Sequence, residues 1–75
     1  MRYKMKEMSA KFVKMNFGEF ANSLNACYVV HYPKCSVIKF RVEGHKMTAK
    51  YAIDGDKYLY RDNELIMHVE KRKAA

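Results

Sequence analysis

The chain has few of the residues that mark specialised architectures. It has no tryptophan, one proline, three glycines and two cysteines among 75 residues. Two cysteines do not make the disulfide framework of a small secreted domain, so we expect a reducing compartment. The three glycines form neither a G-x-x-x-x-G-K-[ST] nor a G-x-G-x-x-G motif, which excludes the common phosphate-binding loops.

Long apolar segments are also missing. No hydrophobic run approaches the length of about 18 residues that a membrane helix needs. The N-terminal MRYKMKEMSAKF is basic and lacks the apolar centre of a secretory signal. We therefore expect a cytoplasmic protein without membrane association, located in the host cell cytoplasm if its source is viral.

What the chain does have is an excess of positive charge. Lys and Arg number 15 against 8 Asp and Glu, for a formal net charge of +7. Such an excess attracts polyanions such as RNA, DNA or an acidic protein surface. A domain of this size has a thin core and little room for a deep substrate cleft. Residues 1–75 are therefore predicted to form a single small basic domain that binds rather than catalyses.

The C-terminal half predicts an antiparallel meander, because apolar and polar residues alternate between short turn signals. The expected two-residue turns are Gly44-His45, Asp54-Gly55 and Asp62-Asn63. The predicted strands are about 36–43, 46–53, 56–61 and 64–71. With these turns the apolar side chains stay on one inner face. The predicted inner face is Ile38, Phe40, Val42, Met47, Ala49, Tyr51, Tyr58, Tyr60, Leu65, Met67 and Val69.

The N-terminal half predicts a fifth strand and a helical cover. Ala26–Tyr32 is rich in Val and Tyr, and we expect Tyr28 and Val30 to face inward. Phe17, Phe20, Ala21 and Leu24 form a helical stripe.

Residues 5–15 also fit a helix, with a bend near Gly18, and the alternative is a strand over 10–17. The predicted fold class is α+β, with an N-terminal helical segment packed on a four- to five-stranded antiparallel β-meander.

The outer face of this sheet is the candidate binding site. Its predicted nucleic-acid-binding residues are Lys39, Arg41, Lys46, Lys50, Lys57, Arg61 and His68. Because the predicted register turns the tyrosines inward, contacts with the nucleic-acid backbone are favoured over base stacking. The simpler alternative is that these cations only solvate an exposed face.

A second hypothesis places a protein partner on the same face. Leu59 and Ile66 oppose each other there and would form the apolar centre of an interface with a cationic rim. The protein would then be an inhibitor or adaptor, for example a virus-encoded blocker of a host or defence complex. An exposed edge strand also makes a homodimer plausible.

Metal, cofactor and catalytic sites have weak support. Cys27, His31 and Cys35 are four residues apart, which on a strand is about 13 Å and too far for shared metal ligation. We predict no metal and no cofactor. His45 and His68 are the only candidate proton shuttles, and a turn and an outer strand position explain them without catalysis. We assign no catalytic residue.

One family resemblance bears on this point. The run FRVEGHKMTAKYAIDG followed by ELIMHVEKRK resembles the terminal sheet of RelE-type bacterial ribonuclease toxins, which implies a ribonuclease as a remote alternative. The resemblance spans less than half the chain and has no specific motif, so no functional residue is carried over. A helix followed by antiparallel strands is also similar to the Alu-RNA-binding subunits of the signal recognition particle and to Sm-like proteins, without their motifs.

Overall fold

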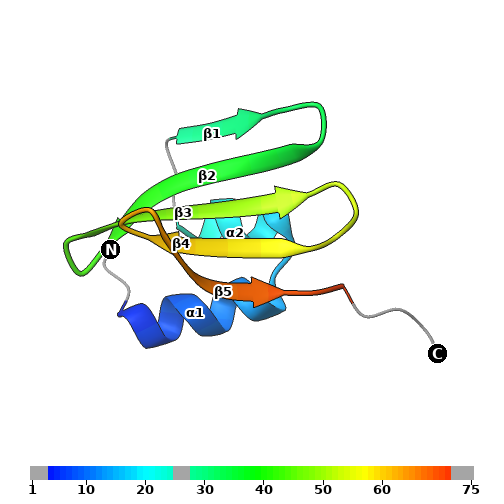
Figure 1. The fold of residues 1–75 in the computed structure, drawn as a ribbon. Helices are drawn as coiled ribbons and strands as arrows, with labels where there is room; N and C mark the ends of the chain where they lie inside the picture. Colours follow the sequence, from blue (N-terminus) through cyan, green and yellow to red (C-terminus); the bar gives the residue numbers. More distant parts are fainter. Residues whose placement is uncertain (1–3, 25–27, 72–75) are drawn as a thin grey trace.

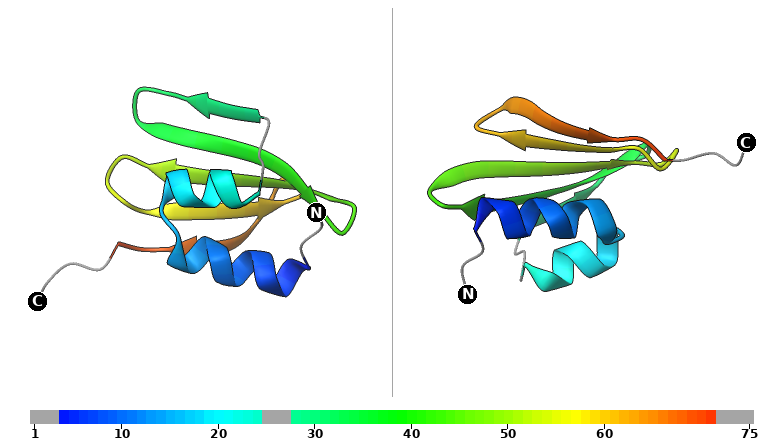
Figure 2. Two further views of the ribbon diagram at one scale, coloured as in Figure 1. Left: turned by 180° about the vertical axis from the view of Figure 1, so that it is seen from behind. Right: turned by 90° about the horizontal axis from the view of Figure 1, so that it is seen from below.

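The computed structural model describes residues 4–24 and 28–71, which form two helices and a five-stranded antiparallel sheet (Figure 1). The strands neighbour one another in chain order, and both helices cover the same face of the sheet (Figure 2). This confirms the predicted α+β class. No helix in these two ranges has the length and apolarity to cross a membrane. The elements are α1 Met5–Lys14, α2 Phe17–Ser23, β1 Tyr28–His31, β2 Cys35–Val42, β3 His45–Ala52, β4 Lys57–Arg61 and β5 Glu64–Val69.

The helical segment is divided at Met15 and Asn16, not near Gly18 as predicted. Both residues have extended backbone. Asn16 Oδ1 accepts the N–H of Glu19 at 2.9 Å, and Glu19 Oε1 accepts the N–H of Asn16 at 3.2 Å. This reciprocal cap starts a new helix and therefore ends the previous one. The alternative of a strand over 10–17 is wrong, because α1 runs through Lys14.

The first hairpin turn is Glu43-Gly44, one residue earlier than predicted. Both residues have positive φ, 51° and 82°, as a type I′ turn requires. The partner of each β2 residue on β3 therefore differs from the predicted one by two positions, and Ile38 opposes Ala49. Because a shift of two keeps every side chain on the same side, the faces of β2 and β3 are as predicted. The Glu43 carboxylate also accepts the N–H of Met5 at 2.7 Å, which joins this turn to the start of α1.

The loop of the second turn is one residue longer than predicted. This difference exchanges the side chains of β4 that face the core with those that face outward. The loop has three residues, Ile53 to Gly55, and Ala52 N–H donates to Asp56 O at 2.9 Å across it. Leu59 therefore opposes Ala49, and Tyr58 opposes Lys50. A one-residue change of register exchanges the two faces of a strand. The predicted inward positions of Tyr58 and Tyr60 are wrong, and both rings lie on the outer face.

The third turn, Asp62-Asn63, is the predicted two-residue turn, with positive φ at both residues. A β-bulge then follows, because Tyr60 opposes Leu65 but Leu59 opposes Met67. The extra residue on β5 compensates for the longer second loop. Met67 and Val69 therefore pack against the core as predicted. Leu65 lies on the opposite, outer face and is 49% exposed.

The core lies between the inner face of the sheet and the two helices. Its aromatic centre is Tyr51, whose ring meets Phe12 and Phe17 edge-on at centroid distances of 5.7 and 5.3 Å. In β1 the predicted faces are wrong, because Tyr28 pairs with outward Lys39 and leaves Val29 to pack against the core. The fully buried residues are Met8, Phe12, Phe20, Ile38, Val42, Met47, Ala49 and Leu59.

The loop before β4 can be tested at Gly55, whose φ is +104°. An alanine there has an unfavourable backbone conformation, and its Cβ would press on the Lys71 side chain. We expect Gly55→Ala to lower the free energy of unfolding by about 1–3 kcal/mol in urea titrations. Gly18→Ala, in α2, is the control and should stabilise by up to about 1 kcal/mol. Equal effects of the two substitutions would contradict this loop conformation.

Tyr51 offers a second test, because its hydroxyl is buried and finds no hydrogen-bond partner among the described residues. Burial raises the pKa of Tyr51 above its ordinary value of 10. Above about pH 10 the unfolded chain therefore ionises this phenol more readily than the folded protein, and stability falls. Tyr51→Phe should be as stable as the wild type or about 1 kcal/mol more stable at pH 7.

The same variant should lose less stability than the wild type when urea titrations are repeated above about pH 10. Tyr32→Phe is the matched control, because the Tyr32 side chain is exposed. A clear loss of stability in Tyr51→Phe at pH 7 would show that the hydroxyl has a partner.

Candidate nucleic-acid interface

The face of the sheet that the helices leave uncovered carries three rows of side chains, which we call the outer rows. The strand register aligns one row across all five strands: Tyr28, Lys39, Thr48, Tyr60 and Leu65. The next row is Val30, Val37, Lys50, Tyr58 and His68. Arg41 and Lys46 oppose each other in the third row.

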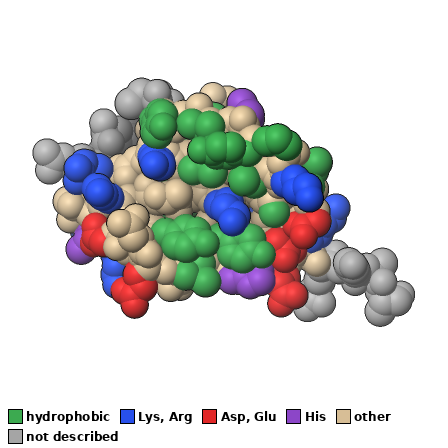
Figure 3. Space-filling model, turned by 45° about the horizontal axis from the view of Figure 1, so that its top comes forward, with side chains coloured by type: hydrophobic (Ala, Val, Ile, Leu, Met, Phe, Trp, Pro, Cys, Tyr) green, Lys and Arg blue, Asp and Glu red, His purple; other side chains and the backbone are tan. Residues whose placement is uncertain are grey.

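The outer rows carry four cations without an ion pair to a described carboxylate, while Asp62 and Asp56 lie at their margins, next to Lys46 and His68. Their cations are Lys39, Arg41, Lys46 and Lys50, and no ion pair with a carboxylate is found for any of them within residues 4–24 and 28–71. No Asp or Glu stands in these rows. In Figure 3 blue side chains lie among green and tan ones, and red side chains lie toward the margins, where some of them adjoin blue ones. Four cations on one face, without ion pairs to described carboxylates, favour the approach of an anion to that face.

Three tyrosines also point outward, contrary to the prediction of a face without aromatic side chains. Tyr28 is 50% exposed, and Lys39 Nζ lies 5.5 Å from its ring centroid. Lys50 Nζ lies 5.2 Å from the Tyr58 ring, and the His68 ring stacks on Tyr58 at 4.4 Å. In the described part of the chain, the Tyr60 ring has no such ring or cation contact. The face therefore combines cations with aromatic rings.

Two of the predicted cations do not belong to this face. Lys57 and Arg61 sit at helix-facing positions of β4, opposite Tyr51 and Met47. Lys57 Nζ donates to the carbonyl oxygens of Phe12, Val13 and Met15 at 2.8, 3.2 and 3.1 Å. It thereby binds the C-terminal end of α1, where a cation is favourable. Desolvation lowers the pKa of Lys57. The other predicted residues, Lys39, Arg41, Lys46, Lys50 and His68, lie in the outer rows.

The predicted apolar centre of a protein interface is also displaced. Leu59 is fully buried in the core, and Ile66, at the bulge, packs against the core. Both errors follow from the one-residue difference in the loop before β4. Leu65 is the exposed aliphatic side chain of β5 instead, and it stands opposite Tyr60.

The two candidate proton shuttles lie on opposite faces. His45 Nδ1 is 2.7 Å from Asp62 Oδ2, and hydrogen bonds from His45 and from the Lys46 N–H lower the pKa of Asp62. His68 Nε2 is 3.3 Å from Asp56 Oδ2. Along the strands the two rings are separated by five positions, about 17 Å. His45 and His68 therefore do not converge on one site.

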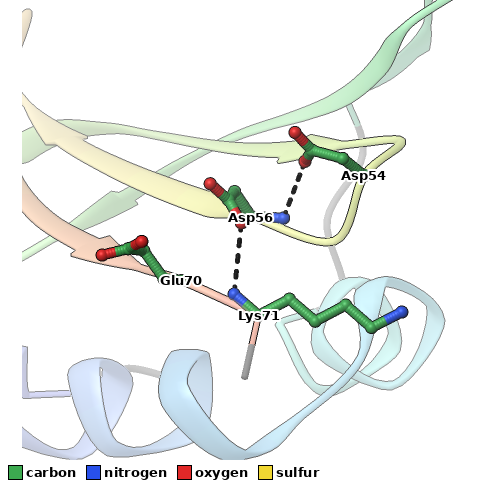
Figure 4. Close-up of a pocket in the computed structure, with 4 residues that line it drawn as sticks. All are labelled: Asp54, Asp56, Glu70 and Lys71. Atoms are coloured by element: carbon green, nitrogen blue, oxygen red, sulfur yellow. Dashed lines mark hydrogen bonds between the residues drawn. The ribbon is translucent and has the colours of Figure 1, made fainter. Parts of the chain in front are cut away.

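A group of carboxylates bounds the outer rows at the β3–β4 loop. Asp54, Asp56 and Glu70 line a surface pocket with Lys71 (Figure 4). Asp54 Oδ1 accepts the N–H of Asp56 at 3.0 Å, and Asp56 Oδ1 accepts the N–H of Lys71 at 3.1 Å. These carboxylates thus hold the loop against the end of β5.

Potential metal ligands are scattered in the described ranges. No group of three or more His, Cys, Asp or Glu that could hold a metal ion is found there. His31 Nδ1 lies 2.9 Å from Ser36 Oγ, and the Cys35 thiol is free. Cys27, the remaining member of the predicted spacing, lies outside the described residues.

Comparison with protein-family models, with curated proteins and with solved structures finds no match to this chain. The geometry and charge of the chain's own residues are therefore the basis on which a function is assigned.

The role of Lys57 can be tested by replacing its ammonium group. We expect Lys57→Met to lower the free energy of unfolding by about 1–3 kcal/mol, because three carbonyl groups lose their donor. Lys46→Met removes the same charge from the outer rows and should change stability by less than about 0.5 kcal/mol. Urea titration of both variants measures the difference, and equal stabilities would contradict the capping role of Lys57.

Proposed function

We propose that the protein is a non-enzymatic nucleic-acid-binding protein that contacts RNA or DNA, free or in a ribonucleoprotein, through the outer rows. The observation that carries the proposal is a group of four cations on the face that the helices leave open, for which the described residues supply no carboxylate partner. A surface of this kind attracts the phosphate backbone, which supplies most of the affinity in nonspecific binding.

The positions of the cations suit a chain of phosphates. Arg41 and Lys46 oppose each other on β2 and β3, about 5 Å apart at the backbone. Lys39 lies two residues from Arg41 along β2, a distance of about 7 Å. Arg41 can donate two parallel hydrogen bonds to one phosphate, and the lysines act as point charges. His68 extends the group when it is protonated.

Binding to a protein partner is the second candidate function, and one observation favours it. Leu65 and Tyr28 are each about half exposed in the same row, and Arg41 lies in the third row. Tyrosine and arginine are the residue types enriched among the residues that dominate binding in protein interfaces. An inhibitor or adaptor that binds an acidic protein surface would use this row as its centre. Pairing of two copies through an edge strand, β1 or β5, stays a prediction. Ribonuclease activity has no comparable support, because His45 and His68 lie on opposite faces.

The proposal is tested by the salt dependence of oligonucleotide binding. With about four phosphate contacts, log K should fall with log salt at a slope of about −3. Lys39→Glu combined with Lys50→Glu should lower affinity more than tenfold at physiological salt. Lys6→Glu combined with Lys14→Glu makes the same charge change on the exposed side of α1 and should have a much smaller effect.

Equal losses in the two double variants would mean that only net charge matters, and the assignment to the outer rows would be wrong. Leu65→Asp separates the second candidate, because it should abolish binding to a protein partner while oligonucleotide affinity falls only by the effect of one charge.

A further inference from the structure

The first outer row places two tyrosine rings on either side of a cation. Tyr28, Lys39, Thr48 and Tyr60 follow one another across β1 to β4. We propose that the ligand is a single-stranded nucleic acid that stacks one base on Tyr28 and another on Tyr60. This inference rests on the proposed function and names the class of nucleic acid that the outer rows select.

The distance between the two rings requires two different bases. Three strand spacings separate Tyr28 from Tyr60, which is about 14 Å. One base cannot contact both rings, so the strand must pass from one ring to the other. Bases inside a duplex are stacked on their neighbours and are not free to lie on a side chain, whereas those of a single strand are.

The two rings are also available for stacking, and Tyr58 is not. Tyr28 is half exposed on an edge strand, and the Lys39 ammonium, 5.5 Å from its centroid, can occupy only one side of the ring. Tyr60 has no ring or cation contact with the described residues. The flanking strands put Lys50 on one side of Tyr58 and the stacked His68 ring on the other. We therefore assign a base to Tyr28 and to Tyr60, and a packing role to Tyr58.

The cations fit the backbone of the same strand. Lys39 stands in the row between the two rings, and the opposed Arg41 and Lys46 form the adjacent row. A phosphate that links the stacked nucleotides can therefore meet Lys39, while neighbouring phosphates meet Arg41 and Lys46. Four-stranded sheets that stack two or three bases on aromatic side chains are an established way to bind single strands. Stacking tolerates any base, so we expect a weak sequence preference.

Binding of fluorescently labelled oligonucleotides tests the inference. The probes are an oligouridine of about eight nucleotides, the matching oligothymidine, and an RNA duplex of similar length. We expect the single strands to bind at least tenfold more tightly than the duplex. Tyr28→Ala and Tyr60→Ala should each raise Kd by about 5- to 100-fold, and the corresponding Phe variants should bind like the wild type. Val13→Ala, an exposed apolar residue of α1, is the control and should have no effect.

Tyrosine fluorescence gives an independent readout, because the chain has no tryptophan. Stacking of bases should quench the tyrosine emission of the wild type. The double variant Tyr28→Phe/Tyr60→Phe should keep its affinity but lose most of that quenching. This comparison decides the question even if the Ala variants fail to fold, which circular dichroism would show. Binding of only the RNA or only the DNA strand still supports the inference and identifies the sugar that is preferred.

The failures of the two proposals are distinguishable. If duplex and single strands bind equally, the Phe and Ala variants bind like the wild type, and salt still weakens binding, the stacking inference is overturned while the charge-based function stands. If no oligonucleotide binds at low salt, both are overturned and a protein partner becomes the better account of the outer rows.

Discussion

The length of the loop between β3 and β4 determines which side chains of β4 lie on the outer face. Because this loop has three residues, Ala49 opposes Leu59 and Lys50 opposes Tyr58. Leu59 thereby enters the core, and Tyr58 and Tyr60 join the cations on the open face. Gly55 provides the positive φ with which such a loop ends. The bulge after the third turn returns β5 to the core side, so the change in register affects one strand and not the rest of the sheet.

The same register gives the basic residues two different roles. Lys57 is directed toward the helices, where an isolated ammonium group is unfavourable. The carbonyl groups at the end of α1 accept its three hydrogen bonds and offset that cost. Lys57 thus joins β4 to α1 and stabilises the packing of helix on sheet. Lys39, Arg41, Lys46 and Lys50 donate no comparable side-chain hydrogen bonds to the described residues, and in our proposal their charge binds the ligand.

Most of the fold could be predicted from the sequence, because periodicity defines elements more reliably than loop length. The α+β class, the inner face of β2 and β3 and the Asp62-Asn63 turn follow from alternation and turn chemistry. The β3–β4 register cannot be predicted in this way, because Asp54-Gly55 suits a two-residue turn and also the last two positions of a three-residue loop. The candidate site was therefore predicted in part: its four cations are on the outer face, and its tyrosines were missed. One signal was present in KYLYR, where Leu59 is the sole aliphatic residue between two tyrosines and is the natural choice for the core.

A proton nuclear Overhauser spectrum of the free protein shows which side chains of β4 face the core and which lie on the outer face. We expect cross-peaks between the Tyr58 and His68 rings, and cross-strand contacts of Tyr60 with Thr48 and of Leu59 with Ala49. Contacts of Tyr60 with Ala49 and of Tyr58 with Tyr51 would instead show a two-residue loop. That result would bury both tyrosines, expose Leu59, and contradict an outer face built from cations and aromatic rings.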